Sequence, residues 1–389
     1  MIEPKLRFKA DDGSQFPDWE EKKLGDITSQ YKVRNKKRLP LEIYSVNNIV
    51  GFIPQSEQFD DAGYLKDTDT SIYMIVPPRH FAYNPARLDI GSIGYQYLDH
   101  DVQVSSLYEV FETSDLVNDE FLWSWFHTHY FNNVVKRLQE GGVRLYFYYD
   151  KMQEVKIGLP SLPEQQKIAE FLSTIDTVIA KQKETVSAWE ERKKGVMQKL
   201  FSQEVRFKAD DGSEFPDWKK KKLEDVVEFL DGQRKPLEAG QRVSGKYPYY
   251  GASGIIDYVN DYIFDEELIL LSEDGANILD RNYRVCFLAK GKYWVNNHAH
   301  VLRAMDRNVN GFLCEQLESF DYRKYNSGGA QPKLNQATCR SIVVNVPCFA
   351  EQQKIADCLS SLDDVIKKQK ATLAAWEEMK KGLLQQMFV

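Results

Sequence analysis

The first half of this 389-residue chain lacks cysteine altogether. The cysteines of the second half form no CxxC pair, so neither a zinc ribbon nor a dithiol redox centre is indicated. They are Cys286, Cys314, Cys339, Cys348 and Cys358. A scaffold held by disulfides in both halves would need cysteines in both, so a reducing cytoplasm fits the sequence best.

Long apolar runs and a basic excess are also missing. No apolar run approaches about 18 residues and no charged-then-apolar segment opens the chain, so we expect neither a membrane span nor a signal peptide. The 51 Lys and Arg face 58 Asp and Glu, which gives a net charge of −7. This balance argues against a general nucleic-acid binder. It does not argue against a protein whose basic residues gather on one face.

Motifs that carry chemistry are absent as well. The segment 83–86 lacks the second proline and the aromatic residue of an amino-methyltransferase motif. The glycine-rich segments 91–94 and 250–254 match neither GxGxxG nor GxxxxGK[ST]. His298 and His300 alternate across a predicted strand, and we expect no acidic partner or cysteine near them. We therefore predict no catalytic residue, no bound metal and no cofactor on this chain.

The chain instead carries one scaffold twice. Residues 7–24 and 206–223 differ at only three of 18 positions, and residues 164–201 and 351–388 agree at 24 of 38. Between these blocks lie segments 25–140 and 224–327, which contain 116 and 104 residues and do not resemble each other. A repeat of this kind predicts two halves that share a scaffold and carry different domains. This arrangement suits a protein that recognises two different targets at a fixed separation.

The second repeated block of each half has the periodicity of a long helix. Its apolar positions alternate in steps of four and three, which is a heptad seam, and Gln182 and Gln369 share one seam position. Each helix either packs on its own domain or pairs with the other, and the shared polar position favours an antiparallel pair that acts as a rigid spacer. The predicted seam residues are Ile168, Leu172, Ile175, Ile179, Gln182 and Trp189, with Ile355, Leu359, Leu362, Ile366, Gln369 and Trp376.

The dissimilar segments are predicted to form compact α/β domains. We expect strands over 102–111, 267–271 and 292–302, and helices over 119–138 and 311–324. The fold class is therefore α+β: two α/β domains alternate with two long helices, paired as an antiparallel coiled coil in a pseudo-two-fold repeat. The predicted division is 1–158 for the first domain, 159–203 for the first helical spacer, 204–345 for the second domain and 346–389 for the second spacer.

Basic, aromatic and amide residues gather in the loops of both segments. Arg can bind guanine, Asn or Gln can bind adenine, and Lys neutralises phosphate. A run of lysines is also common on plain solvated surface, so that alternative stays open for residues 32–38. The candidate DNA contacts are Lys32, Arg34, Lys36, Lys37, Arg38, Arg79, Tyr83, Asn84, Arg87, Arg144, Tyr146, Arg234, Lys235, Ser253, Asn277, Arg281, Gln331, Lys333 and Asn335.

Arg144 and Gln331 hold equivalent positions in this set, each two residues after a Gly-Gly pair. Arg favours guanine and Gln favours adenine, so the two side chains could read different bases from the same scaffold site. The alternative is that both merely cap the turn into the following strand.

These residues together resemble the specificity (S) subunit of type I restriction-modification systems, and the resemblance covers essentially the whole chain. The carrying motifs are Trp19–Ile27 and Trp218–Val226, Leu159–Ala169 with its echo in Glu351–Ala356, Phe81–Arg87, and Tyr247–Gly254 with Asn297–His300. The second copy departs from the pattern at 346–350, where the LPxLP motif of the first copy is lost. We interpret this as drift in a connector.

The resemblance implies two target-recognition domains that each read half of a bipartite site in double-stranded DNA. The helical pair would set the unread gap and dock two modification subunits, which bind S-adenosylmethionine and methylate adenine. Restriction subunits would join for cleavage that requires ATP and Mg²⁺. The alternative, favoured by the net charge of −7, is a coiled-coil adaptor that holds two protein partners and binds no DNA.

Overall fold

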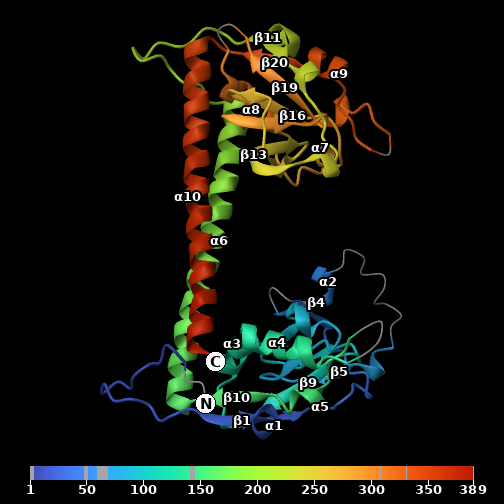
Figure 1. Ribbon diagram of the computed structural model, residues 1–389, viewed down its shortest axis with the longest axis vertical. Helices are drawn as coiled ribbons and strands as arrows, with labels where there is room; N and C mark the ends of the chain where they lie inside the picture. The colour runs from blue at the N-terminus through green and yellow to red at the C-terminus, as the bar shows by residue number, and fades with distance from the viewer. Residues whose placement is uncertain are drawn as a thin grey trace. The chain divides into compact units, whose positions relative to one another are not determined.

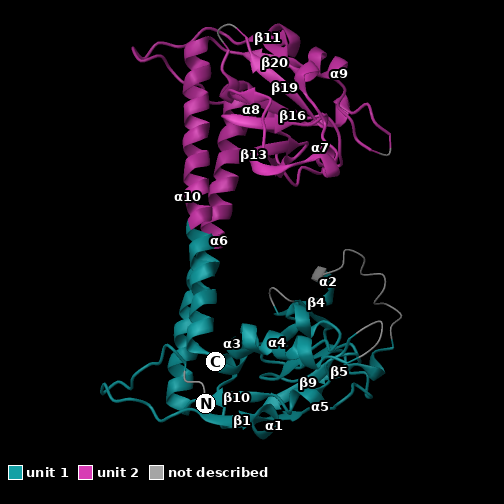
Figure 2. Cartoon of the chain, viewed as in Figure 1, with its two compact units in different colours: residues 1–182, 372–389 teal, residues 183–371 magenta. Residues whose placement is uncertain are grey.

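The computed structural model describes residues 4–47, 51–58, 69–140, 145–305, 308–329 and 331–388. The chain forms two compact units, residues 1–182 with 372–389 and residues 183–371 (Figure 2). Each unit combines a mixed α/β domain with parts of two long helices, α6 (Leu162–Phe201) and α10 (Phe349–Met387) (Figure 1). Both helices lie inside the predicted spacer segments 159–203 and 346–389. None of the described helices combines the length and apolar character that a membrane crossing requires.

The domain of the first unit is built from short strands and helices. They are β1 (Glu20–Lys23), α1 (Leu24–Ile27), β2 (Thr28–Gln30), β3 (Tyr44–Asn47), β4 (Gly51–Pro54), α2 (Gln55–Gln58), η2 (Thr70–Ile72), β5 (Met74–Val76), β6 (Phe81–Tyr83), η3 (Leu88–Ile90), β7 (Ile93–Tyr95), β8 (Val102–Val104), β9 (Glu109–Thr113), α3 (Asp119–Phe126), α4 (His129–Leu138), α5 (Tyr149–Met152) and β10 (Lys156–Leu159). The central sheet is antiparallel in the order β2-β9-β6-β7, and the pairs β3–β4, β5–β8 and β1–β10 complete the described strands.

The domain of the second unit has a different topology, as the dissimilar sequences predict. Its elements are β11 (Lys219–Lys222), η4 (Leu223–Asp225), β12 (Val227–Phe229), η5 (Asp231–Gln233), η6 (Ala239–Gln241), β13 (Ser244–Gly251), β14 (Gly254–Val259), β15 (Phe264–Asp265), β16 (Leu268–Ser272), α7 (Asn277–Asp280), β17 (Cys286–Ala289), β18 (Lys292–Val295), β19 (Ala299–Ala304), α8 (Asn310–Glu318), η7 (Tyr322–Tyr325), α9 (Gln336–Ser341) and β20 (Val343–Val346). Two four-stranded sheets run in the orders β12-β19-β16-β17 and β14-β13-β18-β15, and β11 pairs with β20.

The predicted elements exist but are more broken than expected. The strand expected over 102–111 is split into β8 and β9, and the strand over 292–302 is split into β18 and β19. The helix expected over 119–138 stops at His127 and restarts as α4, because the Thr128 hydroxyl accepts a hydrogen bond from Phe131 N and caps the new helix. Apolar periodicity continues across such a break, so the sequence pattern does not reveal it.

Each unit packs the beginning of one long helix against the end of the other. In the first unit, the core combines Ile168, Leu172 and Ile175 of α6 with Leu384 and Met387 of α10. In the second unit, Lys370 of α10 pairs with Glu190 of α6, while Asp363 pairs with Lys193. Rising numbers in α6 meet falling numbers in α10, so the helices run in opposite directions within this unit. The predicted seam residues are buried or half-buried, and the helices also pack on the domains.

The first repeated block forms an arm that is fastened to the start of α6. The Arg7 guanidinium donates to both carboxylate oxygens of Glu164, at 3.1 and 2.9 Å. Trp19 Nε1 donates to the same carboxylate at 3.2 Å, and Glu164 is fully buried. One turn further along α6, Lys167 binds the carboxylate of Asp11. The arm and the helix start therefore form one buried, charge-assisted clamp.

The second unit repeats this clamp with its own residues. Arg206 donates to both oxygens of Glu351, at 3.0 and 2.7 Å, and Trp218 Nε1 donates to Glu351 at 3.0 Å. Lys354 binds the carboxylate of Asp210 at 2.6 Å. The two repeated blocks of each half are thus contact partners, which explains why both of them recur while the segments between them differ.

The glutamine after each clamp carboxylate connects the helix to the variable domain. Gln165 donates to the Pro160 carbonyl at 2.8 Å and accepts from the backbone N–H of Asn118 at 2.7 Å. Gln352 makes the corresponding bonds to the Pro347 carbonyl and the Val309 N–H, both at 3.0 Å. The proline carbonyl is retained where the connector at 346–350 departs from the first copy.

Arg206→Ala is expected to lower the free energy of unfolding by about 3–5 kcal/mol, because it leaves the buried Glu351 carboxylate without its partner. Lys208→Ala removes an exposed pair with Glu214 and is the matched control, with an expected cost below about 1 kcal/mol. Urea unfolding of both variants checks this. Equal stabilities for the two variants would contradict the clamp.

Candidate nucleic-acid interface

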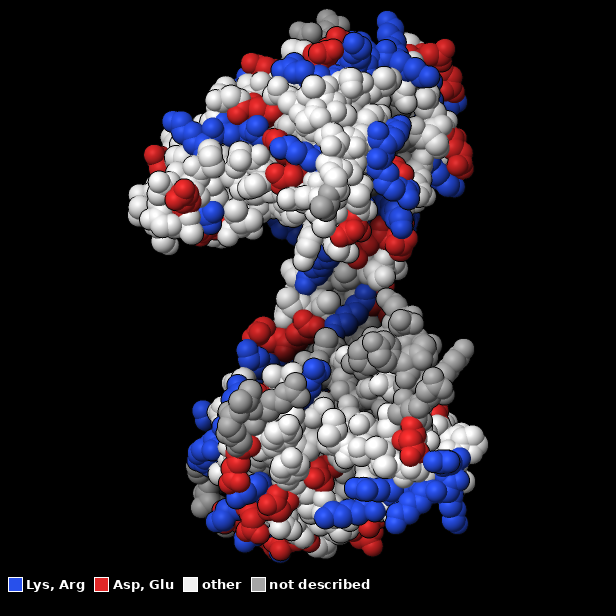
Figure 3. All heavy atoms as spheres, turned by 90° about the vertical axis from the view of Figure 1, so that its right-hand side faces the viewer, with Lys and Arg blue, Asp and Glu red and all other residues white. Residues whose placement is uncertain are grey.

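Basic side chains are gathered unevenly on the surface of both units. Figure 3 shows Lys and Arg in separate patches on one face of each unit, with acidic side chains between them. Charge segregation of this kind lets an acidic protein present local basic surface.

In the second unit, strand register brings five loops to one edge of the two sheets. β12 ends at Phe229 beside β19, whose first residue Ala299 pairs with Ser272 at the end of β16. β13 and β18 run parallel and end together at the same edge, since Tyr250 pairs with Val295. The loops that follow these ends are 231–236, 252–254, 273–277 and 296–298. Segment 326–335 joins them through the Leu334 N–H, which donates to the Glu273 carbonyl at 2.7 Å.

Several predicted contacts lie exposed on this loop cluster. Lys235, Ser253 and Gln331 are exposed, and within the described ranges their side chains have no hydrogen-bond or ion-pair partner. Lys333 is half exposed and lies 3.7 Å from a carboxylate oxygen of Glu273. These four side chains are therefore placed to bind an external ligand that approaches this edge.

Other predicted contacts of this unit are used internally. The Arg234 guanidinium is mostly buried and donates to Glu273 and to the Ala299 carbonyl, both at 2.7 Å. Asn277 donates to the Tyr283 carbonyl at 3.1 Å, and Asn335 caps α9 by accepting from Thr338 N at 2.8 Å. We therefore correct the predicted DNA-contact role of these three side chains to a structural one.

Arg281 also lies away from the loop cluster. Its guanidinium donates to the carboxylate of Glu318 on α8 at 2.9 Å. It lines a hollow together with Glu190 and Lys194 of α6, so it belongs to the side of the domain that faces the helices. Its predicted DNA contact therefore does not belong to this loop edge and stays a prediction.

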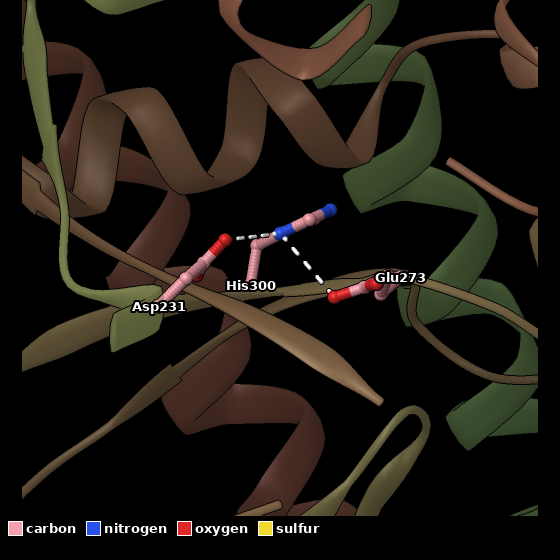
Figure 4. A group of neighbouring side chains, drawn as sticks. All are labelled: Asp231, Glu273 and His300. Carbon is pink, nitrogen blue, oxygen red and sulfur yellow. Dashed lines mark hydrogen bonds and ion pairs between the residues drawn. The ribbon is translucent and has the colours of Figure 1, made fainter. Parts of the chain in front are cut away.

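Asp231, Glu273 and His300 form a compact charged group beneath this edge (Figure 4). His300 Nδ1 lies 2.7 Å from Asp231 and 3.6 Å from Glu273, and Nε2 lies 2.7 Å from the Leu334 carbonyl. A carbonyl only accepts, so Nε2 must donate. Burial is the largest single influence and opposes the charged form of His300, but Asp231 and Cys339 together outweigh it and raise the pKa of the imidazole to about 10.

An imidazolium with both nitrogens donating has no lone pair for a metal, so this group is an ion-pair network. The expectation that no acidic partner lies near His298 and His300 is wrong. His298 Nδ1 lies 2.9 Å from Asp274, and His300 contacts Asp231. Asp231 and His300 are 69 residues apart in the sequence, so local spacing does not reveal the pairing.

In the first unit, the basic side chains of the predicted loop 32–38 are exposed, while Asn35 is buried, and backbone bonds hold the loop. Ile75 N donates to the Val33 carbonyl and Asn35 N donates to the Tyr73 carbonyl, both at 2.9 Å. Lys32, Arg34, Lys36 and Lys37 are exposed without an ion-pair partner among the described residues. Arg38 lies 3.4 Å from Asp69, and both side chains are exposed. The loop thus presents four free cations.

A second group of predicted residues lies near the end of β6. Asn84 accepts from Ala86 N within a turn, and Arg87 is exposed. The Phe147 N–H donates to the Pro85 carbonyl at 3.0 Å, which brings segment 145–148 beside this turn. There Tyr146 stacks on Tyr148, with ring centroids 5.5 Å apart. Arg144 lies outside the described residues.

Two predicted contacts of the first unit fall elsewhere. Tyr83 is fully buried in the domain core, because β6 is covered on both faces, so its predicted contact with DNA is corrected. Arg79 precedes β6 and so lies at the opposite end of that strand from Asn84. Its guanidinium lies 3.3 Å from Asp119, in a hollow that Gln166 of α6 also lines.

Comparisons with known proteins point to one family. A family model described as the type I restriction modification DNA specificity domain matches residues 17–187 and again 216–375. A putative type I restriction enzyme specificity subunit from Haemophilus influenzae is 36% identical over 152 residues, which cover 39% of this chain and 38% of that protein. The MjaVIII specificity subunit from Methanocaldococcus jannaschii is 25% identical over 418 residues, covering 97% of this chain and 94% of that protein.

Solved structures share the fold over nearly the full length. The S subunit of a type I restriction-modification system from M. genitalium matches with a TM-score of 0.61 at 16% identity, covering 100% of this chain and 99% of that chain. A chain from a structure concerning complex assembly and conformational transition of the type I system matches with a TM-score of 0.56 at 14% identity, covering 95% and 97%.

The ion-pair network predicts a pH dependence of stability. The folded-state pKa of His300 lies above its usual value of 6.5, so its stabilising contribution is complete below about pH 6.5 and is lost as pH rises from there through about 10. The free energy of unfolding of the wild type is expected to fall over this window relative to His300→Gln. Urea denaturation of both proteins at about pH 6, 8 and 10 measures the difference. Parallel pH profiles would rule the network out as a source of stability.

Proposed function

Because the chain belongs to the type I restriction-modification DNA specificity family, we propose that it is the subunit that reads DNA sequence for such a system. The observation that carries this proposal is one clamp and helix scaffold that holds two domains of different topology. A scaffold that repeats while its domains differ suits the recognition of two different half-sites.

In this proposal, each domain reads one half of a bipartite site in double-stranded DNA. The second domain approaches its half-site with the loop edge that exposes Lys235, Ser253, Gln331 and Lys333. The first domain uses the basic loop 32–38 and the turn that carries Arg87. Lysines at these edges neutralise phosphate, whereas Arg87 and Gln331 have the donors and acceptors that base edges require.

The two long helices are proposed to pair as an antiparallel coiled coil that fixes the unread gap. Equivalent ion pairs support this: Lys193 Nζ lies 2.7 Å from Asp363 in the second unit, and Lys380 binds Asp176 at 2.5 Å in the first. Each pair joins a lysine of one helix to an aspartate of the other helix. Because Lys193 and Lys380, like Asp363 and Asp176, are equivalent in the repeat, the pairs support a pseudo-two-fold relation.

We further propose that this helical pair docks two modification subunits and that restriction subunits join the assembly. S-adenosylmethionine, ATP and Mg²⁺ are assigned to those partners, and this chain is assigned no catalytic step. The similarity to a chain from a structure of type I complex assembly supports a role as an assembly platform. The competing function is an adaptor that binds two proteins and no DNA, which the net charge of −7 favours. The cations of loop 32–38 that have no ion-pair partner among the described residues favour the DNA reader.

Exchange of residues 25–140 for the corresponding segment of a relative tests the proposal. The exchange leaves Arg7, Trp19 and Glu164 in place, so the clamp is retained. We expect one half-site of the methylated sequence to change while the other half-site and the gap are unchanged. Sequencing of methylated genomic DNA, together with a mobility-shift assay on the assembled methyltransferase, provides the readout.

The complementary exchange within 224–327 is the matched control, and it should change only the other half-site. Simultaneous change of both half-sites after either exchange would contradict modular reading. Absence of DNA binding by the wild-type assembly would favour the adaptor.

A further inference from the structure

One strand of the repeated scaffold differs sharply in charge between the two copies. Blocks 7–24 and 206–223 differ at three of 18 positions, and two of these differences are Glu20 against Lys219 and Glu21 against Lys220. Strand β1 therefore reads EEKK, with two acids and two lysines and a sum of zero, while β11 reads KKKK, with a sum of +4. The change is concentrated on one strand of a block that is otherwise almost identical.

The charges of β1 are balanced inside the first unit. Glu20 pairs with Lys22 at 2.9 Å, which lies on the same strand. Glu21 pairs at 2.6 Å with Lys156 on the neighbouring strand β10. Lys23 completes the set with Glu154 at 2.7 Å. Each charged side chain of β1 thus has an opposite charge within reach.

The charges of β11 are not balanced in this way. Within the part of the chain that the structure describes, Lys219, Lys220 and Lys221 have no hydrogen-bond or ion-pair partner, and Lys222 reaches only Glu224 at 3.5 Å. On the partner strands, Val343 of β20 lies opposite Lys222, whereas Lys156 of β10 lies opposite Lys23. All four lysines are exposed. Neighbouring like charges repel one another, so an external anion would stabilise this strand.

The lysine strand lies within reach of the candidate recognition edge. α9 begins beside Asn335 at that edge and leads after six residues, or about 9 Å, to β20, the partner of β11. Arg340 in the last turn of α9 lies with its guanidinium 4.4 Å from the centroid of the Phe229 ring. Arg340 thus adds a cation on the helix that connects this edge with the partner strand of β11. Figure 3 shows Lys and Arg side chains, interspersed with Asp and Glu, along the upper edge of this unit, where Figure 1 places β11.

We propose that β11 is a second DNA contact, which binds backbone phosphates next to the half-site of the second domain without reading bases. This inference rests on the proposed function. Lysine binds phosphate as a mobile point charge. Four residues rising about 3.4 Å each span roughly three phosphates of one duplex strand. The centres of protein interfaces are instead depleted in lysine and enriched in Tyr, Trp and Arg, and β11 has none of these three, which favours DNA over a protein partner.

The charge difference between β1 and β11 makes the proposed phosphate contact one-sided. Only the second half of the chain carries the lysine strand, so the added phosphate contacts fall on one side of the bipartite site. The complex would then hold flanking DNA more tightly beside one half-site than beside the other, and this extra affinity would depend on salt.

The double variant K219E/K220E tests the proposal, because it restores the EEKK pattern of β1 in the same register. A new acid at position 219 can pair with Lys221 as Glu20 pairs with Lys22, so the strand is expected to fold. For the assembled methyltransferase on a duplex with its site, the slope of log K against log salt should become shallower by about 1.8, at 0.9 for each lost contact. K219Q/K220Q should give the same loss without adding negative charge.

Two controls identify the cause of the reduced salt dependence. K5E/K9E changes the net charge by the same amount at exposed positions of the first arm, and its slope should match the wild type. Duplexes that end at the second half-site should abolish the difference between wild type and K219E/K220E, whereas duplexes that end at the first half-site should preserve it.

The contrary outcomes are distinct. An equal loss in K5E/K9E would assign the effect to net charge and overturn the contact. An unchanged slope with impaired assembly, measured by mass photometry, would overturn it in favour of an acidic partner protein. An unchanged slope with normal assembly would leave the lysines as solvated surface and also overturn it. Failure of the wild-type complex to bind any duplex would reject the proposed function itself.

Discussion

The buried carboxylate at the start of each long helix is the interaction on which the rest of the structure depends. Glu164 and Glu351 are removed from water, and a bidentate arginine and a tryptophan N–H compensate each of them. A buried charge is tolerated only with such complete pairing. This pairing joins the arm to the start of the helix, and it does not involve the loops of the candidate recognition edge.

Each long helix is divided between the two units. α6 begins at the clamp of the first unit and ends in the core of the second through Leu200, while α10 begins at the clamp of the second and ends in the core of the first through Met387. Each domain thus packs against the start of one helix and the end of the other. The length of each helix therefore concerns both domains, whereas the sequence of a loop concerns only the domain that carries it.

The long-range charge pairings are the part of the structure that the sequence could not predict. The heptad spacing located the long helices, because a period of 3.5 is visible within a few turns. Exposure of the basic side chains within 32–38 followed from local composition. In contrast, Arg7 and Glu164 are 157 residues apart, and Arg234 and Glu273 are 39 apart. Tyr83 was misassigned because a short Phe-Ala-Tyr strand buried on both faces has no alternation that would mark it as core.

The central claim is that helix length sets the distance between the two half-sites. The most direct measurement adds one heptad to both helices, between 172 and 189 of α6 and between the equivalent residues 359 and 376 of α10, which keeps the seam in register. Seven residues add about 10.5 Å, or roughly three base pairs at 3.4 Å each. Sequencing of the methylated sites should show unchanged half-sites and a gap longer by about three base pairs. An unchanged gap with full methylation activity would contradict the account.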